Sequence, residues 1–327
     1  MKAVLCKAWG EPSTLGIEEV DSPAPGPGQV RIAVHACGIN FADVLMVMGQ
    51  YQVRPPFPFS PGFEVAGQVL ECGPEVTGVK PGDRVFAFCD YGGFAEEVVA
   101  PAVMTVPLPD DMDFIQAAAF PVAYGTSHVA LTYRVGLQPG ETLLVHGAAG
   151  GVGLTAVEIG KRLGATVIAA ASTPEKLQLA ARYGADQLIN YSQESIRDRV
   201  KELTGGRGAD VIFDPVGGDA FEQSLRCISW EGRLLTIGFA SGRIPQAPVN
   251  LVLVKNFSVV GFYWGSYLQR NPQVIRDSLD VLLDWFQAGT LKPHISLTVP
   301  LERAAEGLYA LLKRKSTGKV VVTTGRG

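Results

Sequence analysis

The chain has 327 residues, of which 47% are hydrophobic and 18% are charged, and its formal net charge is −4. This length exceeds what one hydrophobic core usually organises, and the composition excludes a disordered chain, so we expect about two folded domains. No cluster of Lys and Arg is dense enough to bind DNA or RNA, so nucleic acid is excluded as a partner.

Three further features argue against a membrane or secreted protein. Gly, Pro and charged residues interrupt every hydrophobic segment before it reaches about 18 residues, so we expect no membrane span. Segment 1–12 lacks the apolar stretch and cleavage site of a secretory signal. The five cysteines are scattered, with no Cys-x-x-Cys pair, as is typical of reduced thiols. We therefore expect a cytoplasmic protein without a structural disulfide.

Residues 1–121 are rich in Pro and Gly and in short runs of β character. Pro-Gly and Gly-Pro turns separate these runs, which predicts a compact, mostly β, barrel-like domain. One helix interrupts the strands; it begins near Asn40 and ends at Gly49. The predicted strands are Gln29–Ala36, Glu64–Leu70, Arg84–Phe88 and Ala95–Val99.

The pattern changes in residues 122–267, where short apolar runs alternate with helical stretches. Runs that are apolar on both faces and separated by helices predict a doubly wound parallel sheet, which is the Rossmann type of α/β fold. The predicted strands are Thr142–Val145, Thr166–Ala171, Gln187–Asn190, Asp210–Asp214, Arg233–Ile237 and Ser258–Phe262.

Residues 268–327 follow a sheet that these strands already complete. They contain an amphipathic helix, Pro272–Phe286, a further segment, Val299–Leu312, and a closing strand, Lys319–Thr323. We therefore assign this tail to the first domain. The predicted organisation is a mostly β domain, 1–121 completed by 268–327, and a Rossmann domain, 122–267.

The strongest chemical signal is the run Gly147-Ala148-Ala149-Gly150-Gly151-Val152-Gly153, which lies between a buried strand and a helix. Glycine here allows a tight turn, close approach of the backbone to a diphosphate, and close packing of helix on strand. The N-terminus of the following helix favours anions. Ala148 replaces the first glycine of the common pattern, but the strand before and the helix after support a dinucleotide site. We expect Ala149, Gly150, Gly151 and Val152 to hold the cofactor.

The end of the second strand distinguishes NADH from NADPH. An NAD site places Asp or Glu there against the ribose 2′-hydroxyl, whereas this chain has Ala170-Ala171-Ser172-Thr173. Ser172 and Thr173 offer hydroxyl groups and Lys176 offers a cation to a 2′-phosphate. We therefore predict NADPH as the cofactor, with the alternative that Lys176 is an ordinary solvated helix lysine.

Metal and nucleophile sites are weakly represented in the sequence. The histidines fall in no ligand-like spacing with Cys or Glu, and no cluster of four cysteines occurs, so we predict no zinc site. Cys37 adjoins a strand of alternating pattern and fits a small core residue better than a reactive thiol. His146, at the end of the first Rossmann strand, fits a packed or hydrogen-bonded residue better than a catalytic one.

Five segments together match one protein family: Cys37–Asp43, Pro61–Gly67, Val79–Val85, Ala148–Gly153 and Gly318–Val321. On these segments the chain resembles, over essentially its full length, the zinc-independent quinone oxidoreductases of the medium-chain dehydrogenase/reductase superfamily. In zinc-dependent relatives a Cys ligand stands in place of Asn40 and a Gly-His-Glu motif in place of Gly62-Phe63-Glu64. The resemblance thus implies a GroES-like catalytic domain, a Rossmann domain, and a metal-free active site in the cleft between them.

The resemblance also implies roles for individual residues. Asn40 corresponds to a neighbour of the nicotinamide, and Thr126 corresponds to a residue that lines the site beside it. Many quinone reductases carry a Tyr at the position of Leu45, and we expect Tyr51 to supply that aromatic ring. The set of implied cofactor contacts is completed by Lys176, Tyr191, Phe239 and Arg314.

The expected function is NADPH-dependent hydride transfer to a quinone or conjugated carbonyl. Without a metal or an obvious acid, catalysis must rest on positioning an acceptor that is already electrophilic. One alternative is an enoyl-thioester (enoyl-CoA) reductase, and another is a non-catalytic, crystallin-like NADPH-binding protein. The family also implies a homodimer, paired through the edge strand Ser258–Phe262.

Overall fold

The computed structural model describes residues 1–326, which form two compact units. Unit 1 comprises Met1–Val122 and the residues from Phe286 onward, and unit 2 comprises Ala123–Trp285. The first boundary lies one residue from the expected one, but the second lies after Trp285 instead of after residue 267. The reason is helix α10 (Pro272–Gln287), whose Ser278 Oγ lies 2.8 Å from His128 Nδ1 in unit 2.

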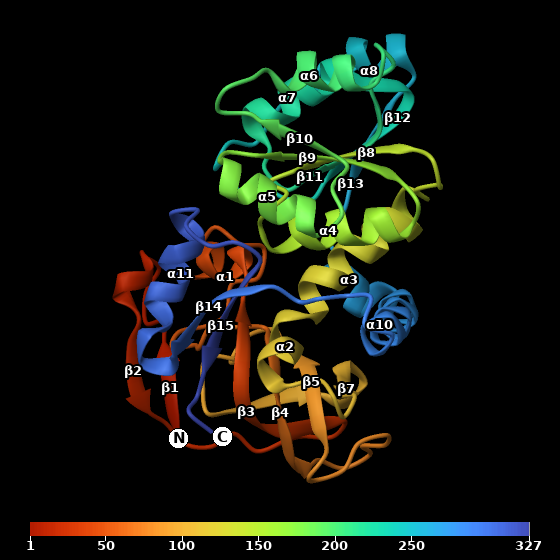
Figure 1. Ribbon diagram of the computed structural model, residues 1–327. Coiled ribbons are helices and arrows are strands. Elements are labelled where there is room, and N and C mark those ends of the chain that lie inside the picture. Colours follow the sequence, from red (N-terminus) through yellow and green to blue (C-terminus); the bar gives the residue numbers. More distant parts are fainter. Residues whose placement is uncertain (327) are drawn as a thin grey trace. The chain divides into compact units, whose positions relative to one another are not determined.

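Unit 1 is built on a mostly antiparallel sheet of seven strands (Figure 1). The strand order is β14-β15-β3-β4-β5-β7, with β6 paired to β3, and only β14 and β15 run parallel. A separate antiparallel pair is formed by β1 (Lys2–Leu5) and β2 (Gly16–Glu19). The strands of the large sheet are β3 (Gln29–Ile39), β4 (Glu64–Cys72), β5 (Arg84–Phe88), β6 (Glu97–Pro101), β7 (Thr105–Pro107), β14 (Ile295–Pro300) and β15 (Lys319–Thr323).

Three helices accompany this sheet: α1 (Phe41–Val47), α2 (Phe114–Ala119) and α11 (Ala304–Leu312). Helix α1 begins at Asn40 because the side chain of Asp43 accepts the backbone N–H of Asn40, the reciprocal half of a capping box. Figure 1 shows α1 beside α11. The mostly β first domain expected from the sequence is confirmed.

Unit 2 contains a six-stranded sheet in which every pair of neighbours is parallel. The order β10-β9-β8-β11-β12-β13 is that of a doubly wound dinucleotide-binding sheet, as predicted. Its strands are β8 (Thr142–His146), β9 (Thr166–Ala171), β10 (Gln187–Asn190), β11 (Ala209–Asp214), β12 (Ile228–Thr236) and β13 (Ser258–Gly261).

Helices cover both faces of this sheet (Figure 1). Helices α4 (Gly151–Arg162) and α5 (Pro174–Arg182) lie on one face, and α6 (Ile196–Leu203), α7 (Gly218–Cys227) and α8 (Val249–Lys255) lie on the other. The remaining helices are α3 (Pro121–Val129) and α9 (Gly265–Arg270). Among residues 1–326, no helix combines the length and the apolar character needed to traverse a lipid bilayer.

Candidate active site

The glycine-rich turn joins β8 to α4 at the carboxyl edge of the unit 2 sheet. Gly147 has φ +56, in the left-handed region that favours glycine, and Gly150 is the N-cap of α4. A Cβ on Gly153 would lie 2.2 Å from the carbonyl oxygen of Gly147, so the helix approaches the turn more closely than any side chain permits. The first N–H groups of a helix have no partners within it, so this turn can receive a diphosphate on backbone amides.

The ends of β9 and β10 lie side by side at the same edge of the sheet, because Ala171 and Asn190 are partners in the ladder. Ser192 Oγ donates to the carbonyl oxygen of Ser172 at 3.0 Å, which ties the two strand ends together. The structure thus brings Ser172 together with Tyr191, which is partly exposed and directly follows β10.

Helix α5 starts at this edge and places Lys176 in its first turn. Thr173, expected to be a donor to a phosphate, instead caps the helix by accepting the backbone N–H of Lys176 at 3.4 Å. The Glu175 carboxylate accepts hydrogen bonds from its own backbone N–H and from the Thr173 hydroxyl, which lowers the pKa of this carboxyl. Besides the Glu175 carboxylate, this edge carries the Ser172 hydroxyl, the Tyr191 phenol and the Lys176 ammonium, which are donors that suit a phosphate.

Thr126 is buried on α3, and its neighbour Ser127 connects α3 to the start of α4. Ser127 Oγ donates to the carbonyl oxygen of Val152 at 2.9 Å and lies 2.8 Å from Thr155 Oγ1. Phe239 follows β12, and a Cβ on Gly217 would lie 3.0 Å from its ring. Both Thr126 and Phe239 therefore belong to unit 2, together with the glycine-rich turn.

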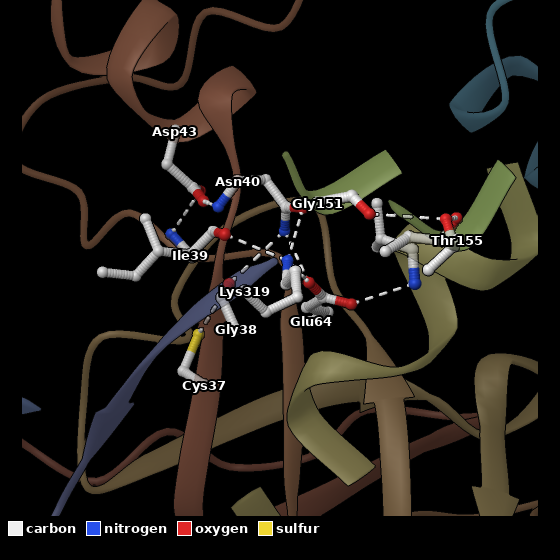
Figure 2. A network of polar contacts seen from close by, with 12 residues as sticks. Cys37, Gly38, Ile39, Asn40, Asp43, Glu64, Gly151, Thr155 and Lys319 are labelled. Carbon is white, nitrogen blue, oxygen red and sulfur yellow. Dashed lines mark hydrogen bonds and ion pairs between the residues drawn. The ribbon is translucent and has the colours of Figure 1, made fainter. Parts of the chain in front are cut away.

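A second polar cluster lies in unit 1, where Asn40 meets Glu64 and Lys319 (Figure 2). Asn40 Nδ2 donates to Glu64 Oε1 at 2.6 Å, and Lys319 Nζ donates to Asn40 Oδ1 at 2.7 Å and to Glu64 Oε1 at 2.5 Å. Glu64 Oε2 accepts the backbone N–H of Val122 at 3.0 Å. Glu64 is fully buried and Lys319 is nearly so.

Asp43 forms the other side of this cluster. One carboxylate oxygen accepts the backbone N–H of Asn40 at 2.8 Å, and the other accepts that of Gly62 at 3.0 Å. Burial raises the pKa of Asp43 to about 7, against the opposing effect of these two N–H groups and of the Lys319 charge. Asp43 therefore orders the loop around Asn40 from the interior of the unit.

Two candidates from the sequence prove to be structural. Cys37 is buried in the core of unit 1, and this burial raises the pKa of its thiol, so the reactive thiolate is disfavoured. His146 is buried with Nε2 2.7 Å from Ser224 Oγ, and burial lowers the pKa of its imidazole. Both interpretations made from the sequence are confirmed.

The remaining residues predicted for the site lie in unit 1. Tyr51 is partly buried and packs against the unit 1 core. Arg314 lies two residues after the last residue of α11, Leu312, and is exposed, with φ +54. Sequence reasoning missed Lys319 as a site residue, although a lysine that opens a strand otherwise apolar, Lys319-Val320-Val321-Val322, was the available signal.

The residues of the unit 1 cluster do not fit a zinc ion. Asn40 and Phe63 stand where zinc-dependent proteins would offer Cys and His, and the Lys319 ammonium already occupies Glu64 Oε1. Over the described part of the chain, residues 1–326, no group of three or more His, Cys, Asp and Glu side chains is placed to hold a metal.

Comparison with known proteins gives two family matches. Residues 26–110 match the alcohol dehydrogenase GroES-like domain, and residues 151–283 match the family described as zinc-binding dehydrogenase. The description of the second family names zinc, whereas the unit 1 cluster of this chain has Asn40 and Phe63 at the positions where zinc-dependent proteins would offer Cys and His ligands.

Full-length relatives narrow the family. The chain is 46% identical to a quinone oxidoreductase-like protein 2 homolog of Nematostella vectensis, covering 99% of this chain and 89% of that one. It is 37% identical to a quinone oxidoreductase of Pseudomonas aeruginosa, covering 98% and 99%. The crystal structure of Escherichia coli quinone oxidoreductase complexed with NADPH is similar with a TM-score of 0.94 at 30% identity, covering 99% and 100%. The chain belongs to the zinc-independent quinone oxidoreductase family of the medium-chain dehydrogenase/reductase superfamily.

Proposed function

We propose that the protein binds NADPH on unit 2 and transfers hydride, without a metal, to a quinone or a conjugated carbonyl compound. One observation carries the cofactor assignment: the adjoining ends of β9 and β10 bring Ser172 and Tyr191 together, with Lys176 on the helix that begins there. The relatives that are named quinone oxidoreductases, one of them solved with NADPH, support both the cofactor and the reaction class.

The chain's own residues divide the work of binding. Backbone amides at Ala149, Gly150, Gly151 and Val152 hold the diphosphate, while Ser172, Lys176 and Tyr191 hold the 2′-phosphate. Thr126 and Phe239 contribute to the cofactor site on the same unit. When bound, NADPH supplies the hydride; with a proton from solvent, a quinone becomes a hydroquinone and the cofactor becomes NADP⁺.

For unit 1 we propose that Asn40 contacts the nicotinamide or the acceptor, that Tyr51 lines the acceptor site, and that Arg314 adds positive charge near the 2′-phosphate. Support for these roles comes from the family resemblance and, for Asn40, from the polar cluster that fixes its side chain. A homodimer paired through β13 fits the position of that strand at the edge of the sheet, and size-exclusion chromatography with light scattering tests it.

The cofactor assignment is tested by replacing Lys176 with Ala. Because a charge-assisted hydrogen bond to a phosphate is lost, we expect the Kd for NADPH to rise roughly 10- to 100-fold while the Kd for NADH stays nearly constant. The matched control is Lys201→Ala on α6, a solvated lysine of the same unit, which should change neither constant. Equal weakening of both cofactors in Lys176→Ala would refute the assignment.

The reaction class is tested by following NADPH oxidation against a panel of quinones, enones and enoyl-CoA thioesters. Turnover with quinones or enones supports the proposal. Turnover confined to enoyl-CoA thioesters would replace it with the enoyl-thioester reductase, and tight NADPH binding without oxidation by any acceptor would replace it with a non-catalytic binding protein.

A further inference from the structure

Lys319 is an unusual residue for its position. It opens β15, whose other residues are Val320, Val321, Val322 and Thr323, and only 6% of its surface is exposed. Burying an ammonium group is costly unless each of its donors finds an acceptor and its charge finds a partner. The hydrogen-bond acceptors and the charge partner around Lys319 therefore indicate the role of this residue.

Each of the three N–H donors of the ammonium has an acceptor (Figure 2). These are the carbonyl oxygen of Ile39 at 3.0 Å, Asn40 Oδ1 at 2.7 Å and Glu64 Oε1 at 2.5 Å. Since no donor remains, Lys319 cannot itself donate a hydrogen bond to an acceptor molecule. Any effect that it has on a reaction must pass through the residues that it holds.

The residue held most specifically is Asn40. Its carboxamide lies between an ammonium, which can only donate, and two groups that can only accept, the Glu64 carboxylate and the carbonyl oxygen of Gly38, 3.4 Å from Asn40 Nδ2. The amide oxygen must face Lys319 and the amide nitrogen must face Glu64, because the reversed amide would set donor against donor and acceptor against acceptor. Chemistry, and not only packing, thus gives this amide a single orientation.

We propose that Lys319 is a positioning residue that fixes the Asn40 carboxamide in one orientation for hydride transfer. Lys319 has a second task, which is to neutralise Glu64 inside the unit. The two roles can be separated by mutation. A neutral residue at position 64 removes the need for the positive charge of Lys319, but the Asn40 carboxamide still has to be held in one orientation. The link to hydride transfer rests on the proposed function, whereas the orientation itself does not.

The activity experiment compares Lys319→Met with the double variant Lys319→Met/Glu64→Gln. Lys319→Met leaves a buried carboxylate without its cation, so it should lose both stability and activity. The double variant has no buried charge at the pair and should recover most of the thermal stability. Because the Val122 N–H holds the oxygen of the introduced glutamine, the glutamine NH2 faces Asn40 and favours the reversed amide, whereas the carbonyl oxygen of Gly38, 3.4 Å from Asn40 Nδ2, still favours the original one. With two competing orientations, we expect kcat with a quinone to stay roughly 10- to 100-fold low, with little change in the Kd for NADPH.

The matched control is Lys255→Met. Lys255 also donates to three acceptors, the carbonyl oxygens of Leu225, Arg226 and Ile228, but at the end of α7 in unit 2. Its loss should lower stability and leave kcat unchanged. If the double variant recovered stability and kcat together, Lys319 would be only a charge partner for Glu64, and the proposal would fail.

A measurement without turnover separates this inference from the proposed function. In protein labelled with ¹⁵N-asparagine, the side-chain amide of Asn40 should give one sharp pair of NMR resonances, assigned by its loss in Asn40→Ala. In the double variant we expect this pair to double or broaden as the amide samples two orientations. An unchanged pair would overturn the orientation argument even if the wild type oxidises NADPH, and a doubled pair would support it even if no acceptor is found.

Discussion

Among the glycines of unit 2, Gly153 is the one whose replacement with Ala should most disturb the glycine-rich turn between β8 and α4, which we propose binds the cofactor. The added Cβ would lie 2.2 Å from the Gly147 carbonyl oxygen and 2.8 Å from its carbon, both of them backbone atoms. An ordinary C···O contact needs about 3.3 Å, so the first turn of α4 must move away by about 1 Å. Overpacking of this kind typically costs about 1–3 kcal/mol, and a rigid backbone on both sides places the cost at the upper end.

The same displacement moves the helix amides away from a bound diphosphate. We expect the Kd to rise roughly 10- to 100-fold for NADPH and for NADH alike, because the two cofactors share the diphosphate. This pattern differs from the one expected of Lys176→Ala, which is selective for NADPH. Fluorescence titration measures both constants, and urea unfolding measures the stability.

Gly16→Ala, on β2 of unit 1, is the control, because a Cβ there meets nothing within 4 Å. Its unfolding free energy should stay within about 0.5 kcal/mol of the wild type. If Gly153→Ala bound both cofactors with wild-type affinity, the turn would not be the diphosphate site and the reasoning from backbone proximity would be refuted.

Two further changes concern stability. Burial lowers the pKa of His128 from 6.5 to about 4, so between these pH values the unfolded chain binds a proton at His128 that the folded chain does not bind. The stability contributed by neutral His128 is therefore complete above pH 6.5 and is lost as the pH falls toward 4. Against His128→Asn, the wild type should lose about 3 kcal/mol of unfolding free energy over that interval, and parallel pH profiles from urea titrations would contradict this. Asp113 caps α2 by accepting the backbone N–H of Gln116 at 2.8 Å, so Asp113→Ala should cost about 1 kcal/mol in urea unfolding, and a cost near zero would show that the cap contributes nothing.

The parallel sheet of unit 2 could be predicted because its signals are local. Buried parallel strands are apolar on both faces, and the turn after β8 needs glycine for backbone reasons, as at Gly147 and Gly153. The strands Thr166–Ala171 and Gln187–Asn190 have the same bounds in the structure as in the sequence analysis. The sequence signals for such features lie within a few residues of the structure that they determine.

The second unit boundary could not be predicted in the same way. The amphipathic pattern of α10 states that the helix has an apolar face, but not which core receives it. The structure shows the answer in side-chain contacts with residues far earlier in the chain, such as His128 with Ser278 and the Arg162 guanidinium 4.3 Å from the centre of the Trp285 ring. Segment 299–312 was likewise treated as one stretch, whereas the chain ends β14 at Pro300 and starts α11 at Ala304.

The ion pair at the candidate site could not be predicted from the sequence either, because Lys319 and Glu64 are 255 residues apart in the chain. Its consequence for chemistry follows from how completely the cluster is satisfied. The three N–H groups of the Lys319 ammonium donate to Ile39, Asn40 and Glu64, so none remains for the oxygen of a molecule that accepts the hydride. An acceptor whose developing negative charge is spread over a conjugated system requires little such stabilisation, whereas an isolated ketone requires much. The saturation of this cluster therefore supports the proposed preference for quinones and enones over simple ketones, for a reason independent of the names of the relatives.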